Sequence, residues 1–215
     1  MSSRTLTRVR ADAARNRQAV LDAARDLFGR EGLDTSMETV ARAAGVGVGT
    51  VYRHFPDRGT LVRAVIADRI AHVTGLVEQA RTRLDEDPVA AWWGLFDGLI
   101  ASGLPLLVPT LVPRSNDAEV FPAELLAARS RTARAAEEVL HAAQQHGVVR
   151  TDIGAAEIML LLAGALRRMP GLPPELDEAL IARRVPLVRD ALRPDGTALP
   201  GAALALTTVL DALGG

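Results

Sequence analysis

The residues around Gly45 constrain the fold more than any other part of this sequence. On either side of it, residues 36–44 and 48–55 each have the composition and length of a helix of about two turns. Gly45-Val46-Gly47 separates them, because glycine reaches positive φ at little cost and ends a helix. Thr35 or Ser36 is expected to cap the first helix, and Pro56 closes the second. Two short helices joined by such a turn predict a helix-turn-helix.

The rest of the chain is also predicted to be helical. Residues 11–32 carry apolar side chains at three- and four-residue steps, the period of one helix face. Further helices are expected over residues 57–84, 88–103, 123–146, 152–169, 175–192 and 198–213. The proline-punctuated residues 105–122 allow only short helical pieces. Because no strand alternation exceeds four residues, the sequence predicts an all-α fold.

Composition argues against an enzyme, a cofactor and a metal site. The 215 residues contain no cysteine, which excludes a disulfide framework, thiolate-bound zinc and a cysteine nucleophile. His141 and His146 are five positions apart and therefore do not share a helix face. No Gly-x-Ser-x-Gly motif is present, and the carboxylates lie in mixed-charge runs typical of solvated helix faces.

Charge is distributed unevenly along the chain. Residues 1–70 hold 12 arginines and eight acidic residues, whereas residues 71–215 hold 13 arginines and 18 acidic residues. A basic N-terminal third on an acidic body favours a polyanionic partner for that third. The N-terminal segment lacks the apolar stretch of a secretory signal, and the longest apolar stretches are too short or too interrupted to span a membrane. We therefore expect a cytoplasmic protein that does not bind membranes.

The second short helix has the side chains needed to enter a DNA major groove. Ala41 is small where the two helices meet, and Val51 anchors the second helix on the core. The residues left to face bases and phosphates are Val48, Gly49, Thr50, Tyr52, Arg53 and His54. Tyr52 either packs its ring or extends its hydroxyl to a phosphate. The arginines before residue 20 form either a free tail or an arm in the minor groove.

Gly45-x-Gly47-x-Gly49 also resembles a nucleotide-binding fingerprint. That motif requires a preceding strand within a βαβ unit. Here the flanking residues are an alanine-rich helix and Tyr52-Arg53-His54, so the sequence does not support nucleotide binding.

The motifs from Ala23 to Leu61 resemble the DNA-binding domain of the TetR family of bacterial transcriptional regulators. They include Leu27-Phe28, Thr39-Val40-Ala41, Ala44-Gly45-Val46 and Gly49-Thr50-Val51-Tyr52-Arg53-His54-Phe55. The resemblance implies an all-helical homodimer with an N-terminal three-helix DNA-binding domain and a C-terminal helical domain for ligand binding and dimerisation. We place these domains at residues 1–56, with a basic N-terminal arm, and 57–215.

Two positions depart from the family's usual pattern. The family commonly has serine where this chain has Gly47, so a bare backbone amide replaces a hydroxyl contact and an N-cap. It commonly has lysine where Arg58 stands, which should preserve a phosphate contact. The complete set of expected DNA contacts is Ser36, Arg42, Gly47, Val48, Gly49, Thr50, Tyr52, Arg53, His54 and Arg58. Phe28, Val40, Val51, Phe55 and Leu61 are expected in the core.

The C-terminal part has bulky apolar residues that can line a cavity or fill a core. The candidates for ligand contact are Trp92, Phe96, Leu107, Phe121 and Met159. Adjacent tryptophans point about 100° apart on a helix, so only one of Trp92 and Trp93 is expected to face a pocket. Apolar stripes follow in residues 158–166 and 180–192, either as internal core or as a four-helix interface with a second copy.

Two functions fit these features. The first is a regulator, expected to be a repressor, that binds double-stranded DNA at a palindromic operator and is released by a small apolar or amphipathic inducer. The second is a small-molecule-binding protein or enzyme that keeps the DNA-binding fold as a relic. Thr50, Tyr52 and Arg53 retain the chemistry for DNA contact, which favours the regulator.

Overall fold

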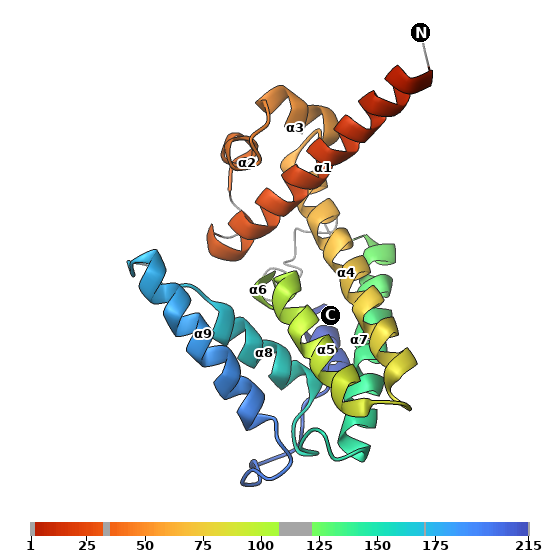
Figure 1. The fold of residues 1–215 in the computed structure, drawn as a ribbon, viewed down its shortest axis with the longest axis vertical. Coiled ribbons are helices and arrows are strands. Elements are labelled where there is room, and N and C mark those ends of the chain that lie inside the picture. The colour runs from red at the N-terminus through yellow and green to blue at the C-terminus, as the bar shows by residue number, and fades with distance from the viewer. Residues whose placement is uncertain (1–2, 32–34, 108–121, 170, 215) are drawn as a thin grey trace. The chain divides into compact units, whose positions relative to one another are not determined.

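The computed structural model describes residues 3–31, 35–107, 122–169 and 171–214, and within these ranges the chain forms helices and turns without a strand (Figure 1). The all-α fold class is therefore confirmed. The helices are α1 (Ser3–Glu31), α2 (Met37–Ala43), α3 (Val48–His54), α4 (Arg58–Arg83), α5 (Pro88–Ser102), α6 (Leu104–Leu107), α7 (Ala123–Gln145), α8 (Ala155–Leu166), α9 (Pro174–Ala191) and α10 (Leu206–Gly214). None of these described helices is long and apolar enough to cross a lipid bilayer.

The chain divides into two compact units, Met1–Asp68 and Arg69–Gly215. The division falls inside α4, so this helix contributes residues to both units. The functional assignment of residues 1–56 and 57–215 to separate domains stays a prediction.

Helix α2 begins and ends at its predicted capping residues. The Ser36 hydroxyl oxygen accepts a hydrogen bond from the Thr39 amide at 3.1 Å, so Ser36 is the N-cap. After the helix, Gly45 has φ +66°, a left-handed conformation in which a side chain would be strained. Asp57 caps α4 in the same way, since its Oδ1 atom accepts from the Thr60 amide at 2.6 Å. Short-range capping chemistry thus sets the ends of these helices.

The core of the first unit contains the residues that we expected to be internal. All five are at most 2% exposed: Phe28, Val40, Val51, Phe55 and Leu61. Within α3, Val51 is the buried residue, and the other side chains of this helix are exposed or half-buried. One side of α3 is therefore attached to the core while the rest of its surface stays open.

Helix α1 is longer than predicted. We expected it to begin near Ala11, with the basic residues before it as an arm, but it begins at Ser3. Residues 3–10 contain neither glycine nor proline. Once residues 20–28 have packed, extending a helix backwards fixes only one residue for each added hydrogen bond. The N-terminal arginines therefore belong to a helix rather than to an unstructured tail.

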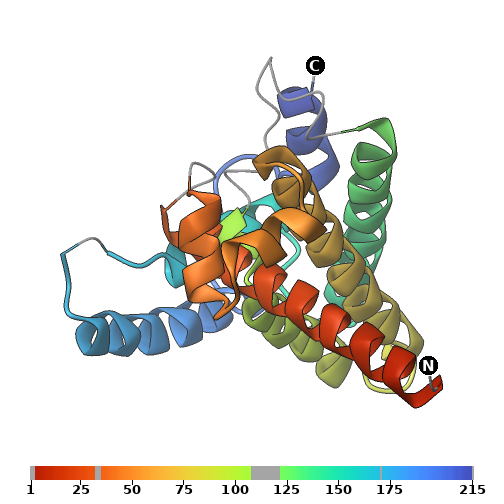
Figure 2. The same ribbon diagram turned by 90° about the horizontal axis from the view of Figure 1, so that it is seen from above.

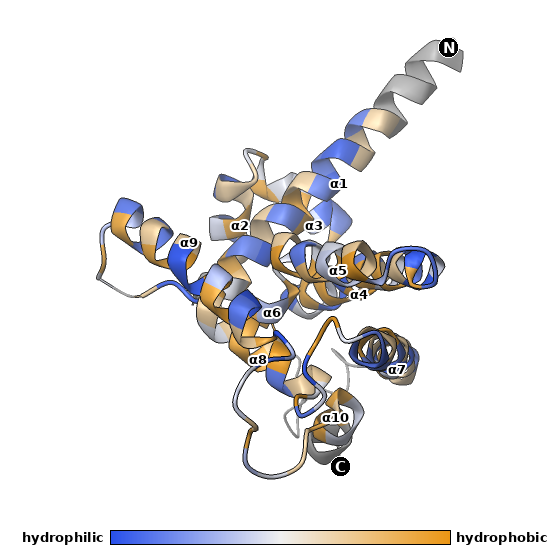
Figure 3. Cartoon of the chain, turned by 60° about the horizontal axis from the view of Figure 1, so that its bottom comes forward, coloured by the Kyte–Doolittle hydropathy of each residue, from blue (hydrophilic) through white to orange (hydrophobic). Residues whose placement is uncertain are grey.

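The second unit also begins with predicted helix ends. The Asp87 carboxylate accepts from the Ala90 amide at 2.9 Å and caps α5 directly before Pro88. Helices α7 and α9 lie within one residue of their predicted limits at both ends. Apolar residues, orange in Figure 3, run along α4, α5 and α8, where the core of this unit forms.

Two predicted helices have different limits in the structure. The helix expected over residues 152–169 is α8, which begins only at Ala155 and ends at Leu166. Glu157 accepts from the Gly154 amide at 2.7 Å, which makes Gly154 the N-cap in place of Asp152. At the other end, the Met169 amide donates to Asp177 at 3.1 Å and directs the chain into the next turn. The helix expected over residues 198–213 is α10, and residues 198–205 are not helical.

Asp152 is instead part of an anchor for the segment after α9. Its Oδ1 and Oδ2 atoms accept hydrogen bonds from the Arg150 guanidinium at 2.5 and 2.9 Å. The Leu199 amide also donates to Asp152, at 2.7 Å, and Arg150 donates to the Thr197 carbonyl. The Arg150 guanidinium and the Leu199 amide hold the pKa of Asp152 well below its ordinary value of 3.8. This cluster therefore favours an ionised carboxylate and fixes residues 197–199.

We expect Asp152→Asn to lower the urea midpoint of unfolding at pH 7. Because the pKa of Asp152 is lower in the folded state, its contribution is present above the unfolded-state pKa and is lost as pH falls through the folded-state value. The difference between wild type and variant should therefore shrink below about pH 4. Asp190→Asn, which changes an exposed carboxylate of α9, is the control. A difference that stays constant from pH 7 to pH 3 would contradict the role of Asp152.

Candidate nucleic-acid interface and ligand cavity

The turn between α2 and α3 fixes the direction in which α3 follows α2. The amides of Gly45 and Val46 donate to the carbonyls of Arg42 and Ala41 at 3.2 and 3.1 Å, so the end of α2 is hydrogen-bonded. Helix α3 then begins at Val48, with Val51 buried beneath it. This arrangement is a helix-turn-helix in which α3 is the helix available to a DNA groove.

The ten expected DNA contacts all lie on the segment from the α2 N-cap to the start of α4. Eight are exposed: Ser36, Arg42, Gly47, Val48, Gly49, Tyr52, Arg53 and Arg58. Thr50 and His54 are half-buried. Tyr52 is 44% exposed, which leaves its hydroxyl available to a phosphate. That these residues touch DNA stays a prediction.

Helix α1 supplies a further cation beside α3. The Arg17 guanidinium lies 5.4 Å from the centre of the Phe55 ring, within range of a cation–π interaction. Phe55 is the C-cap of α3, so Arg17 lies near the end of that helix and is exposed. The sequence showed Arg17 only as one of several N-terminal arginines, because nothing local indicates that it packs on Phe55.

Gly47 leaves the N-terminus of α3 without a side-chain cap. Its backbone is extended, with φ −68° and ψ 144°, and a Cβ atom there would meet only Thr50 Oγ1, at 4.0 Å. A serine therefore fits without strain. We expect Gly47→Ser to stabilise the protein by roughly a few tenths of a kcal/mol and to tighten DNA binding through its hydroxyl. Gly47→Ala is the matched control in thermal melts and binding titrations; equal DNA affinity of the two variants would contradict this prediction.

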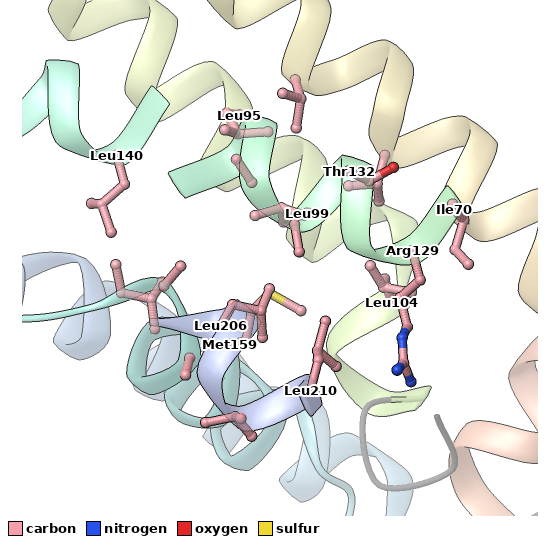
Figure 4. Close-up of a pocket in the computed structure, with 18 of the residues that line it drawn as sticks. Ile70, Leu95, Leu99, Leu104, Arg129, Thr132, Leu140, Met159, Leu206 and Leu210 are labelled. Atoms are coloured by element: carbon pink, nitrogen blue, oxygen red, sulfur yellow. The ribbon is translucent and has the colours of Figure 1, made fainter. Parts of the chain in front are cut away.

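The second unit contains an apolar cavity of about 120 Å³ that is partly open to solvent (Figure 4). Its lining comes from α4, α5, α6, α7, α8 and α10. Of the five expected ligand contacts, Trp92 and Met159 line the cavity. Phe96 and Leu107 are buried but are not among the lining residues, and Phe121 lies outside the described part of the chain.

The two tryptophans of α5 have different surroundings, as their angular separation predicted. Trp92 is buried at the cavity, whereas Trp93 is half-buried and lies edge-on to Phe96, with ring centres 5.4 Å apart. The Arg189 guanidinium of α9 lies 4.7 Å from the Trp93 ring and pairs with Asp97. Trp93 and Phe96 therefore connect α5 to α9.

The polar groups at the cavity come mainly from α7. The Thr132 hydroxyl is already engaged, since it lies 2.7 Å from Thr74 Oγ1 and 3.1 Å from the Ala128 carbonyl. The Arg129 side chain contributes a cation at one end of the cavity (Figure 4). Most of the remaining described lining is aliphatic, which suits an apolar molecule.

Sequence comparisons match each of the two units to a family domain. The family described as "Bacterial regulatory proteins, tetR family" matches residues 20–65, and "Transcriptional regulator SbtR-like, C-terminal domain" matches residues 87–194. The HTH-type transcriptional regulator SAUSA300_2515 of Staphylococcus aureus (strain USA300) is 44% identical over 59 residues, which is 27% of this chain and 32% of that protein. The match thus spans about a third of the length of this curated relative.

Solved structures resemble the chain over most of its length. The TetR transcription regulatory protein from Mycobacterium vanbaalenii is 39% identical with a TM-score of 0.50, and the match covers 86% of this chain and 99% of that one. The TetR transcriptional regulator SCO0520 from Streptomyces coelicolor is 29% identical with a TM-score of 0.50, over 84% and 99%. The regulator LfrR from Mycobacterium smegmatis, solved with proflavine, shares the fold at 23% identity and a TM-score of 0.54, over 86% and 99%.

A helix-turn-helix joined to a helical body defines a transcriptional regulator rather than an enzyme. With both of its parts matched to family domains, the chain belongs to the TetR family of bacterial regulators. The resemblance inferred from the sequence is therefore confirmed.

Proposed function

We propose that the protein is a repressor that binds a palindromic operator as a homodimer through α3 and releases it when a small apolar or amphipathic molecule binds. One observation supports the DNA-binding part of this proposal. Helix α3 exposes Tyr52 and Arg53 while Val51, beside them in sequence, is buried. A helix held on one side, with a hydroxyl and a guanidinium on the other, suits a major groove about 12 Å wide.

The surface of α8 and α9 supports a homodimer. Part of the apolar stripe predicted on α8 is internal, since Ile158, Leu162, Ala165 and Leu166 are buried within the unit. Other large apolar residues of the two helices remain open to solvent: Leu161, Leu176 and Leu187, which are 43–68% exposed, whereas the exposed Leu160 lines the cavity. Exposed large apolar side chains on two helices that contact each other favour contact with another protein. A second copy of the chain is the partner that a palindromic operator requires.

The cavity supports the ligand-responsive part of the proposal. It lies in the second unit and is lined on one side by Ile70, Val73 and Val77 of α4. A ligand with an apolar body would contact these residues, and a polar group on it would lie near Thr132 and Arg129 in the lining. An amphipathic molecule of this kind is therefore the inducer class that we propose.

Selection of bound duplexes from a random DNA library tests the DNA-binding proposal. We expect the recovered sites to converge on a pseudo-palindrome with half-sites about one helical turn apart or slightly more. Light scattering at micromolar protein should give the mass of a dimer. A monomer that selects a site without symmetry would refute the proposed mode of binding.

A further inference from the structure

Helix α10 forms one wall of the cavity, although it lies beyond residue 194, where the match to the C-terminal family domain ends. Three of its residues line the cavity: Leu206, Val209 and Leu210 (Figure 4). Their spacing of three and four positions places them on one face of the helix. The end of the chain thus helps to determine the size of the cavity.

The cavity is smaller than the usual binding site of an organic ligand. A volume of about 120 Å³ is slightly less than that of engineered apolar cavities of roughly 150 Å³ that accept benzene. Sites for larger organic ligands occupy roughly 300–1,000 Å³. A molecule larger than a single ring therefore becomes fully buried in this cavity only if one wall moves.

Helix α10 is a wall that can move at lower cost than α4, α7 or α8. The walls formed by α4, α7 and α8 include Val77, Leu140 and Ile158, which are at most 5% exposed and belong to the core. The three cavity residues of α10 are only half-buried. The helix packs on α7 and α8 near the C-terminus (Figure 2). Moving it would uncover less apolar surface than moving a core helix.

Two carboxylates hold α10 in place, together with a backbone hydrogen bond from the Ala156 amide to the Leu204 carbonyl at 3.3 Å. Glu137 of α7 accepts hydrogen bonds from the Thr207 amide at 2.9 Å and from the Thr207 hydroxyl at 3.2 Å. Glu157 of α8 accepts from the Leu204 amide at 3.2 Å, directly before α10 begins. Both contacts attach the N-terminal end of α10 and leave its cavity face apolar.

An exposed segment precedes these contacts. Leu199 is held by the Asp152 anchor, whereas residues 200–203 are exposed. Gly201 within this stretch has φ +86°, a conformation that favours glycine. The segment between Leu199 and Leu204 can therefore change direction while the anchor before it stays fixed.

We propose that α10 is a displaceable cover of the ligand cavity, latched by Glu137 and Glu157, which limits the size of the ligands admitted. Single-ring molecules bind with the cover in place, and larger apolar molecules bind by displacing it. The inference rests on the proposed ligand cavity.

Two variants of the full-length protein release the cover without altering the cavity lining. Glu137→Ala removes the acceptor of Thr207, and Glu138→Ala, at the exposed neighbouring position of α7, is its control. Gly154→Ala adds a methyl group that would collide with the Leu204 carbonyl oxygen and push away the segment leading into α10. Gly154 has φ −105° and ψ 168°, so alanine suits its backbone.

The probes are toluene and the larger, uncharged N-phenyl-1-naphthylamine. Quenching of tryptophan fluorescence in a Trp93→Phe background and naphthylamine emission report binding, and hydrogen–deuterium exchange reports opening of α10. We expect both variants to bind the naphthylamine at least about tenfold faster than wild type, because hydrogen bonds to a charged acceptor have been lost or displaced. Toluene affinity should change little, and exchange should rise in residues 204–214.

Unchanged naphthylamine kinetics and exchange in both variants would overturn the cover while leaving the cavity as a ligand site. Failure of both probes to bind any variant would overturn the ligand-responsive part of the proposed function, and the cover with it. Neither result depends on operator DNA, so the DNA-binding proposal is judged separately.

Discussion

Replacing Arg53 by alanine is expected to weaken binding to the selected operator by about 1–3 kcal/mol, because a guanidinium that reads a guanine through two hydrogen bonds contributes that much discrimination. Arg53 is exposed on α3, two positions after buried Val51. Its removal should therefore leave stability within about 0.5 kcal/mol of wild type. Fluorescence anisotropy with labelled operator gives the affinity, and thermal melting gives the stability.

Two further variants test whether the loss of operator affinity is specific to Arg53. Arg131→Ala removes an exposed arginine of α7 and should leave operator affinity unchanged. Tyr52→Phe removes only a hydroxyl and should weaken binding by less than Arg53→Ala does, since a single phosphate contact is lost. If Arg53→Ala and Tyr52→Phe both bind as tightly as wild type, α3 does not contact the operator as proposed.

The helix-turn-helix could be predicted from the sequence because its determinants are local. The N-cap at Ser36, the left-handed Gly45 and the buried Val51 lie within one short segment. Each depends on neighbours a few positions away in sequence. The start of α5 is also set locally, because Asp87 caps this helix from the position directly before it.

Helix limits that depend on contacts outside the capping turn differ from the sequence prediction. The start of α8 was placed at Asp152, but this carboxylate is occupied by Arg150 and by the amide of Leu199. The end of α8 depends on Asp177, whose carboxylate accepts a hydrogen bond from the Met169 amide. A sequence pattern indicates that these residues are polar but does not give their partners across the fold.

The cavity depends on which apolar faces meet, and periodicity does not supply that information. Its lining combines Ile70, Leu140 and Leu206, which lie on three helices far apart in sequence. Trp92 and Phe96 have similar sequence environments on α5, yet only Trp92 lines the cavity. The part played by α10 was missed for the same reason, since its apolar face is indistinguishable in sequence from that of an ordinary packed helix.

Binding of an apolar ligand in the cavity is expected to lower operator affinity at least about tenfold, or about 1.4 kcal/mol. Helix α4 provides the connection within one continuous helix. Leu61 and Val65 belong to the core of the first unit, and Ile70, Val73 and Val77 line the cavity. Helix α10 supplies most of the added volume for a large ligand, but a ligand that packs against Ile70, Val73 and Val77 would also tilt α4 slightly and so shift its other end, which begins shortly after α3. Because the spacing of DNA grooves is fixed, a shift of a few ångströms would remove the contacts of one half-site.

The coupling must be reciprocal. If saturating N-phenyl-1-naphthylamine weakens operator binding by a given factor, saturating operator must weaken binding of the naphthylamine by the same factor. Titrations monitored by operator anisotropy and by naphthylamine emission measure the two factors independently. Ala133→Leu fills the cavity from α7 without touching α4's first turn, so it should abolish the ligand effect while preserving operator binding. If the naphthylamine saturates the cavity and operator affinity does not change, α4 does not transmit binding of this ligand, and the cavity is a site without regulatory effect for it.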